Sequence, residues 1–177
     1  MAEYVKIPAE RIEVLLANKE KIKREIEKGT NTELEIDEEA CDVEIIETER
    51  MEDPLAVWKA RDIVKAIGRG FEPEIAMMLL DENNVLKVID LKAFVGKSKN
   101  AAIRIKGRVI GREGKSKKKI SEITDTEMVV YSKTVAIIGK MEYVEIAARA
   151  VDMLASGSMH GSAFKMVEEE MAKAVTK

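Results

Sequence analysis

Two glycines that enclose a charged pair, Gly111-Arg112-Glu113-Gly114, form the segment of this 177-residue sequence whose residue types and spacing could do chemistry. Glycine adopts positive φ angles and carries no Cβ, so a backbone rich in glycine can lie close to a phosphate group. A predicted helix begins directly afterwards, at Lys115. The N-terminus of a helix offers unpaired N–H groups and the positive end of the helix dipole. The segment therefore predicts an anion-binding loop.

Positive charge is concentrated around this loop. The net charge of −3 hides an uneven distribution, because residues 1–96 carry 14 basic and 23 acidic side chains whereas residues 97–177 carry 16 and 10. A strongly basic segment, here residues 97–119, attracts polyanions, although a charged helix face that contacts only solvent is the alternative interpretation. Between residues 97 and 119 the only acidic residue is Glu113, against ten cations: Lys97, Lys99, Arg104, Lys106, Arg108, Arg112, Lys115, Lys117, Lys118 and Lys119.

A nucleotide-binding P-loop is the rival interpretation, because Gly114-Lys115-Ser116 matches the end of its consensus. That consensus requires a glycine where this sequence has Val109, and it places the loop after a strand rather than a helix. The single histidine, His160, has no neighbouring nucleophile and is expected to be a surface residue or a minor contact. One histidine and one cysteine cannot complete a Cys/His zinc site. The sequence thus favours a binding protein that is not an enzyme and needs no metal or cofactor.

An internal repeat organises the chain. The pattern I-x-x-x-T-[ND]-T-E occurs at residues 26–33 and again at residues 120–127, and Ala60-Arg61 later recurs as Ala148-Arg149. The two offsets differ, so the connecting loops differ in length, as expected for a duplicated domain. The repeat predicts two domains, residues 1–82 and residues 83–177.

Each copy has the same predicted order of elements, β-α-α-β-β-α, in an α+β fold with helices on one face of a three-stranded sheet. Hydrophobic spacing and turn residues give the boundaries. In the first copy we predict a strand at 4–7, a helix from 8 to 29, strands at 32–36 and 42–47, a helix at 54–67 and a short helix at 73–80. In the second we predict a strand at 85–94, helices at 99–110 and 115–123, strands at 127–132 and 134–139, and helices at 142–155 and 162–174.

The first copy lacks the glycine loop. Ala17-Asn18-Lys19-Glu20 occupies its place, and Glu20 would set an anion where a phosphate must approach, so this copy should not clamp nucleic acid. Apolar spacing continues through the position from Ile12 to Ile26, which predicts that the two helices merge or bend there. Thirteen acidic and two basic residues lie between Glu25 and Asp53. A scaffold that supports the second domain and a dedicated protein interface both fit this half.

The helix-loop-helix setting of the glycines resembles the K-homology (KH) domain, whose G-x-x-G loop clamps about four single-stranded nucleotides. The whole chain, with R-V-I-G-R-E-G-K-S-K-K-K-I at the loop and G-S-M-H-G-S after the last core helix, is similar to the archaeal two-KH family. The eukaryotic relative of that family is the small-subunit assembly factor called partner of Nob or Dim-two. The resemblance implies two tandem type I KH domains, the first degenerate, and a C-terminal helix. It also implies a non-enzymatic role in binding the 3′ end region of small-subunit ribosomal RNA, with the rRNA-trimming endonuclease and the alpha subunit of translation initiation factor two as partners.

Carried onto this sequence, the resemblance assigns the RNA backbone clamp to Gly111, Arg112, Glu113 and Gly114. It assigns the base-reading groove to Gly107, Arg108, Ile110, Ile120, Met128 and Val130, with Arg108 as a hydrogen-bond donor at the rim. The surrounding positive field is supplied by Arg104, Lys115, Lys117 and Lys118.

Two alternatives to ribosome assembly remain open. One is a general KH regulator of messenger RNA, and the other is a protein–protein adaptor with a vestigial RNA site. The apolar runs are too short to span a bilayer, and the N-terminal residues show no targeting pattern, so we expect a cytoplasmic protein without membrane contact.

Overall fold

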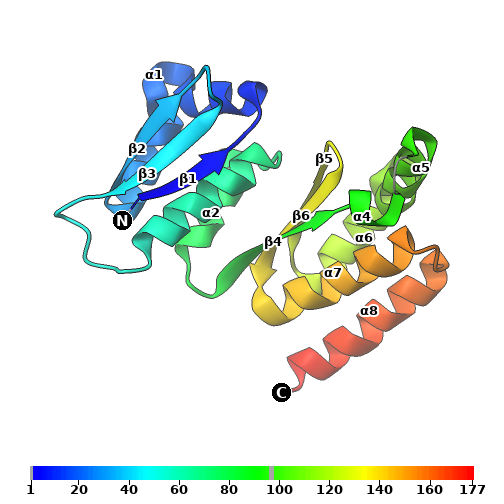
Figure 1. The fold of residues 1–177 in the computed structure, drawn as a ribbon. Helices are drawn as coiled ribbons and strands as arrows, with labels where there is room; N and C mark the ends of the chain where they lie inside the picture. Colours follow the sequence, from blue (N-terminus) through cyan, green and yellow to red (C-terminus); the bar gives the residue numbers. More distant parts are fainter. Residues whose placement is uncertain (1, 96–97) are drawn as a thin grey trace. The chain divides into compact units, whose positions relative to one another are not determined.

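The computed structural model describes residues 2–95 and 98–177, so Lys97, one of the ten cations in the basic segment, lies outside the described residues. The chain divides into two compact units, Met1–Glu82 and Asn83–Lys177. Figure 1 shows a three-stranded sheet with helices in each of them.

The first unit begins with a strand, a long helical segment and a hairpin, and ends in helices. Its elements are β1 (Ala2–Lys6), α1 (Ala9–Thr30), β2 (Thr32–Asp37), β3 (Asp42–Glu47), α2 (Ala56–Gly68), α3 (Pro73–Ala76) and the 3₁₀ helix η1 (Met77–Leu80). Strand β2 alternates buried Thr32 and Leu34 with exposed Glu33 and Glu35. This period of two buries one face of the sheet against the helices and leaves the other face charged.

The second unit repeats that order with an added turn of helix and a longer C-terminal part. Its elements are β4 (Asn84–Asp90), α4 (Lys92–Val95), α5 (Lys99–Ile110), η2 (Arg112–Gly114), α6 (Lys115–Thr124), β5 (Glu127–Tyr131), β6 (Thr134–Lys140), α7 (Met141–Ala155) and α8 (His160–Val175). Helices α5, α6, α7 and α8 pack around one apolar core that includes Val109, Ile120, Ile137, Val151 and Val167.

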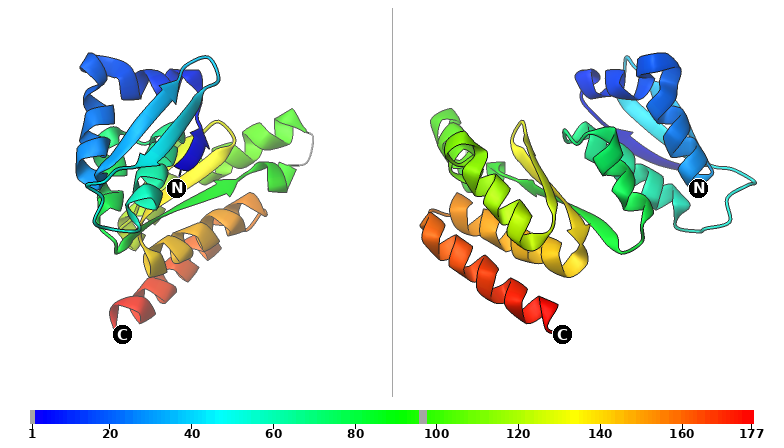
Figure 2. Two further views of the ribbon diagram at one scale, coloured as in Figure 1. Left: turned by 60° about the vertical axis from the view of Figure 1, so that its left-hand side comes forward. Right: turned by 180° about the vertical axis from the view of Figure 1, so that it is seen from behind.

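Both sheets are antiparallel, with the last strand of each unit in the middle: β1-β3-β2 in the first and β4-β6-β5 in the second. The long helices lie on one face of each sheet (Figure 1, Figure 2). The predicted α+β fold with two β-α-α-β-β-α domains is confirmed.

The repeated sequence pattern forms the same turn in both units. Thr30 donates its hydroxyl to the Ile26 carbonyl at 2.7 Å, and its Oγ1 lies 2.7 Å from that of Thr32. In the second unit Thr124 bonds the Ile120 carbonyl at 2.7 Å and contacts Thr126 at 2.8 Å. The residue between each pair of threonines is left-handed, with φ 51° at Asn31 and 49° at Asp125, a conformation that Asn and Asp tolerate. The spacing shared by the two units thus encodes a helix end followed by a strand.

One predicted strand is too long. The sequence predicts extended structure from Val85 to Phe94, but β4 ends at Asp90 and helix α4 follows. The carboxylate of Asp90 accepts a hydrogen bond from the Lys92 N–H at 2.9 Å. Such a bond starts a turn and competes with strand continuation.

Two kinds of feature are absent from residues 2–95 and 98–177. No helix there is long and apolar enough to cross a membrane. No group of three or more His, Cys, Asp or Glu side chains is placed to hold a metal ion.

Candidate nucleic-acid interface

The glycine loop begins with a backbone conformation that only glycine adopts readily. Gly111 has φ 77° and ψ 172°, a region that is almost closed to residues with a side chain. A Cβ at this position would lie 2.7 Å from the Ser116 backbone nitrogen and would overlap the Ser116 hydroxyl. Gly111 is therefore required by the packing of the loop on the first turn of α6.

The loop ends in an open left-handed turn. Glu113 has φ 57° and Gly114 has φ 75°, so two successive residues are left-handed. Apart from Gly114 itself, its chain neighbours and the backbone of its own helical turn, no atom of the described residues lies within 4 Å of a Cβ built at Gly114. The space beside Gly114 is therefore open to a ligand, and the N-terminus of the ten-residue helix α6 begins at its edge.

Exposed cations surround this opening. Arg112 is exposed, and the Lys115 and Lys118 side chains are each 75% exposed. Lys115 lies 3.9 Å from Glu113, a solvent-exposed ion pair that contributes little and leaves the ammonium group accessible. These side chains supply the positive field that the sequence predicts.

Lys117 has a different environment from its neighbours. Its Nζ donates to the Met128 carbonyl at 3.2 Å, across from α6 to β5, and the side chain is partly buried. This bond joins helix α6 to strand β5. Lys117 therefore stabilises the packing of these two elements as well as adding positive charge.

Two of the residues predicted to line the base-reading groove belong to the core instead. Ile120 is fully buried and Met128 is 6% exposed, and both lie in the core cluster of the second unit. The reason is periodicity: the inner stripe of α6 and the inner face of β5 point at the sheet–helix core. Val130 also packs against this cluster but is partly exposed, as is Ile110 on α5. Of the predicted apolar floor, only Ile110 and Val130 reach the surface.

Arg108, predicted as a donor at the rim, makes two hydrogen bonds within its own unit. Its Nε donates to the Leu154 carbonyl at 3.0 Å, and its Nη2 donates to the Ser158 carbonyl. In return the Nε2 atom of His160 lies 2.9 Å from the Arg108 carbonyl oxygen. The guanidinium thus fixes the connection between α7 and α8 to helix α5. This contact could not be predicted from local sequence, because Leu154 and Ser158 lie 46 and 50 residues further along the chain.

The predicted RNA-binding residues of helix α5 lie on two different sides of the helix. Arg104, Gly107 and Arg108 line a recess of about 500 Å³ that Arg112, Lys115, Lys119, His160 and Phe164 also line. The Nζ of Lys119 lies 4.4 Å from the ring centroid of Phe164, a cation–π contact with helix α8. Ile110 is not among the lining residues of this basic recess. The structure therefore places Gly107 beside a basic recess that Ile110 does not line.

The first unit also has a left-handed turn at the equivalent position, although it has no glycine there. Of the two predicted alternatives, a merged or a bent helix, the structure shows a sharp bend, because Asn18, Lys19 and Glu20 have φ 52°, 57° and 61° and separate two helical segments within α1. Each left-handed residue with a side chain costs roughly 1–2 kcal/mol. Apolar spacing could not reveal the break, since both segments bury the same side, including Leu15 and Ile26. Glu20 lies 3.6 Å from Lys23 at this turn.

Comparisons with known proteins agree with this geometry. Residues 85–172 match the family described as the eukaryotic type KH domain, KH-domain type I, and residues 3–82 match the Krr1 KH1 domain. A KH domain-containing protein of Methanocaldococcus jannaschii is 48% identical over 171 residues, which cover 97% of this chain and 74% of that protein. RNA-binding protein pno1 of Dictyostelium discoideum is 30% identical over 164 residues, which cover 90% of this chain and 67% of the relative.

A solved structure extends the likeness to three dimensions. The crystal structure of an a/eIF2alpha–aDim2p–rRNA complex from Pyrococcus horikoshii contains a chain 48% identical to this one, with a TM-score of 0.91. The match covers 98% of this chain and 95% of that one. The chain belongs to the Dim2/PNO1 family. In this Dim2/PNO1 protein the glycine loop lies in the unit that matches the type I KH domain, and the loop without glycine lies in the unit that matches the Krr1 KH1 domain.

Gly107 offers a test of where a ligand approaches this Dim2/PNO1 protein. It is an exposed glycine inside α5, and no described atom lies within 4 Å of a Cβ at that position. Because glycine destabilises a helix interior by roughly 0.5–1 kcal/mol relative to alanine, Gly107→Ala should strengthen α5 by that amount. Hydrogen exchange of the α5 amides would measure the gain. We expect RNA affinity to fall several-fold in the same variant, and unchanged affinity would mean that RNA does not approach this side of the helix.

Proposed function

We propose that this protein binds single-stranded RNA through the Gly111–Gly114 loop of its second unit. The observation that carries the proposal is the loop itself, in which an open left-handed turn at Gly114 meets a helix N-terminus amid exposed cations. Backbone amides and lysines at such a site recognise phosphate. Phe164, which lines the recess beside the loop, is only partly exposed, and this fits a narrow KH groove rather than a base-stacking surface.

The RNA that fits the family is ribosomal. The Pyrococcus structure includes rRNA and a/eIF2alpha, and relatives are named as pre-rRNA-processing proteins. We propose that the target here is the 3′ end region of small-subunit rRNA, bound during its maturation in the cytoplasm. The proposed protein partners are the initiation factor two alpha subunit and the endonuclease that trims this end.

We propose that the two units have different binding functions. Residues 83–177 hold the RNA, whereas residues 1–82, with a left-handed turn that ends in Glu20, serve a protein partner or support the second unit. Crosslinking the full chain to RNA in its native cells and sequencing the attached fragments tests the target. Enrichment of the 3′ end of small-subunit rRNA is expected, and fragments spread over messenger RNAs would contradict the ribosomal assignment.

RNA binding should depend strongly on salt. Each phosphate contacted by a cation contributes about −0.7 to the slope of log affinity against log salt for a single strand, so a clamp on about four nucleotides predicts a slope of roughly −2 to −4. Titrations of a short oligonucleotide at several salt concentrations measure it. Lys118→Ala should reduce the steepness by about 0.7, since Lys118 is exposed and supplies one contact. A flat response would exclude a phosphate clamp.

A further inference from the structure

The outer face of the first sheet consists mostly of carboxylates. Side chains alternate between the two faces of a strand, so the residues next to buried Leu34, Val43 and Ile45 point away from the helices. The register of β1, β3 and β2 places on this outer face Ala2, Tyr4, Lys6, Glu33, Glu35, Asp37, Asp42, Glu44 and Ile46. Five of these residues are acidic and one is basic. We call this surface the acidic face.

Carboxylates on the acidic face lie directly opposite one another. Glu35 pairs with Glu44, and Asp37 pairs with Asp42, in the antiparallel register of β2 and β3. Like charges opposite one another on neighbouring strands destabilise a sheet. The arrangement therefore lowers the stability of the first unit, and a cationic ligand would relieve the repulsion.

The second unit shows that the fold does not require these charges. Glu33 and Glu127 end the repeated sequence pattern, so equivalent positions can be counted from them. Where the first unit has its two acidic pairs, β5 and β6 place Val129 opposite Ala136 and Tyr131 opposite Thr134. None of these four residues is acidic. The acidic pairs are thus a property of the first copy and not of the duplicated fold.

The acidic face also contains a recess with an aromatic ring. Tyr4 is 62% exposed, and its hydroxyl donates to Glu44 Oε1 at 2.8 Å. That bond and the surrounding carboxylates raise the pKa of the Tyr4 phenol. Tyr4, Glu44 and Asp42 line a recess of about 260 Å³, and the Oδ1 atom of Asp42 is buried without a hydrogen-bond partner among the described residues. A guanidinium group can stack on such a ring while carboxylates accept its N–H groups.

We propose that the acidic face binds an extended, arginine- or lysine-rich segment of a protein partner. Glu33, Glu35 and Asp37 point outwards at every second position of β2, which spaces them about 7 Å apart. An extended partner segment presents every second side chain at the same spacing, so cations at alternate positions would meet these carboxylates. Residues 1–82 carry 12 basic and 22 acidic side chains, a balance that attracts a basic protein and repels nucleic acid. The inference rests on the proposed function only in the protein-binding role of residues 1–82, and it does not depend on the RNA clamp.

The test measures binding of two labelled peptides to the full chain by fluorescence anisotropy at low salt. Both peptides contain four arginines and three threonines, which alternate in one peptide, whereas the arginines are contiguous in the other. We expect the alternating peptide to bind several-fold more tightly. Glu35→Gln combined with Glu44→Gln should weaken its binding about tenfold, through the loss of two exposed ion pairs. Glutamine keeps an oxygen that accepts the Tyr4 hydroxyl, and one like-charged pair is removed, so the melting temperature should not fall.

The matched control removes the same charge from helix α1. Glu13→Gln combined with Glu25→Gln changes two exposed glutamates that lie outside the acidic face, and it should keep the wild-type affinity for the alternating peptide. Equal binding of the two peptides, or equal loss in the two variants, would overturn the proposal. It is also overturned if a polyamine of the same charge binds as tightly as the alternating peptide, because the face would then attract any polycation. RNA binding without peptide binding refutes the acidic face alone, whereas peptide binding without RNA binding refutes the RNA clamp alone.

Discussion

Replacing both charged residues of the loop with aspartate, in Arg112→Asp combined with Glu113→Asp, is expected to lower affinity for single-stranded RNA roughly 10- to 150-fold. One cation is lost and two anions then face the RNA backbone, at a point where the N-terminus of α6 attracts phosphate. Contacts to charged groups contribute about 1.5–3 kcal/mol, which gives this range. Both glycines remain, and aspartate tolerates the left-handed conformation that Glu113 has at φ 57°. Fluorescence anisotropy of a labelled oligonucleotide measures the loss.

The matched control lies in the first unit. Asn18→Asp combined with Lys19→Asp changes the charge by more than the loop variant does, at the equivalent left-handed turn. We expect less than a twofold effect on affinity, because Glu20 already places an anion there. A larger loss from the first-unit variant, with circular dichroism unchanged, would show that the clamp has been assigned to the wrong unit.

Gly111→Ala is expected to destabilise the second unit by about 3 kcal/mol. The added Cβ would lie 2.7 Å from the Ser116 nitrogen and overlap its hydroxyl, and Ser116 is buried beneath the loop. Overpacking of this kind costs about 1–3 kcal/mol, and a conformation reserved for glycine costs a similar amount. Denaturant unfolding followed by circular dichroism, together with hydrogen exchange of α5 and α6 peptides, measures the loss.

Gly114→Ala provides the contrast within the same loop. Its Cβ meets no described atom within 4 Å, so the stability cost should be that of a left-handed alanine, about 1 kcal/mol. Its effect on RNA should nevertheless be clear, because the methyl group would occupy the space where a phosphate approaches. Equal destabilisation by the two substitutions would contradict the distinction between a glycine required by packing and one required by access.

The local sequence determined most of the architecture. Periods of two and of 3.6 residues located the strands and helices, and the repeated T-[ND]-T-E pattern encodes a turn made of bonds between residues two and four apart. The glycine loop could also be predicted from the sequence, because its conformation depends on residues within one short segment. Local interactions of this kind depend only on neighbouring residues, so a single sequence suffices to predict them.

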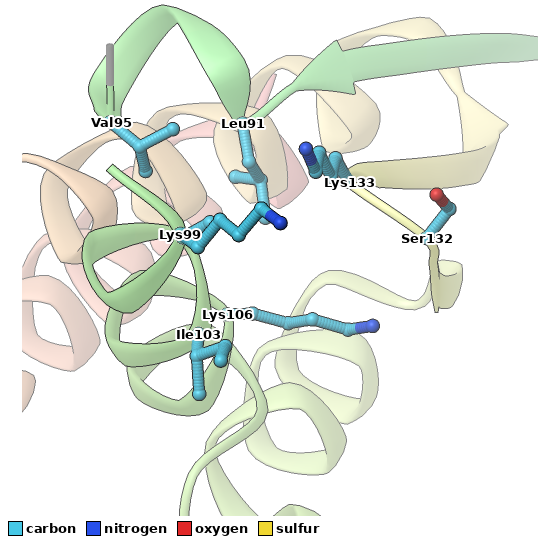
Figure 3. Close-up of a pocket in the computed structure, with 8 residues that line it drawn as sticks. Leu91, Val95, Lys99, Ile103, Lys106, Ser132 and Lys133 are labelled. Carbon is cyan, nitrogen blue, oxygen red and sulfur yellow. The ribbon is translucent and has the colours of Figure 1, made fainter. Parts of the chain in front are cut away.

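The division of the candidate site was decided by tertiary structure. Periodicity placed Ile120 and Met128 on an apolar face, but only packing showed that this face is the core, and only the fold carried Leu154 and Ser158 to the Arg108 guanidinium. The left-handed turn at Asn18–Glu20 contains no glycine, so the sequence did not indicate it. The pocket that Ile103 and Lys133 line (Figure 3) likewise joins α5 to a turn that is distant in the chain. Contacts between segments distant in the chain depend on how several elements pack at once, and no local pattern records that arrangement.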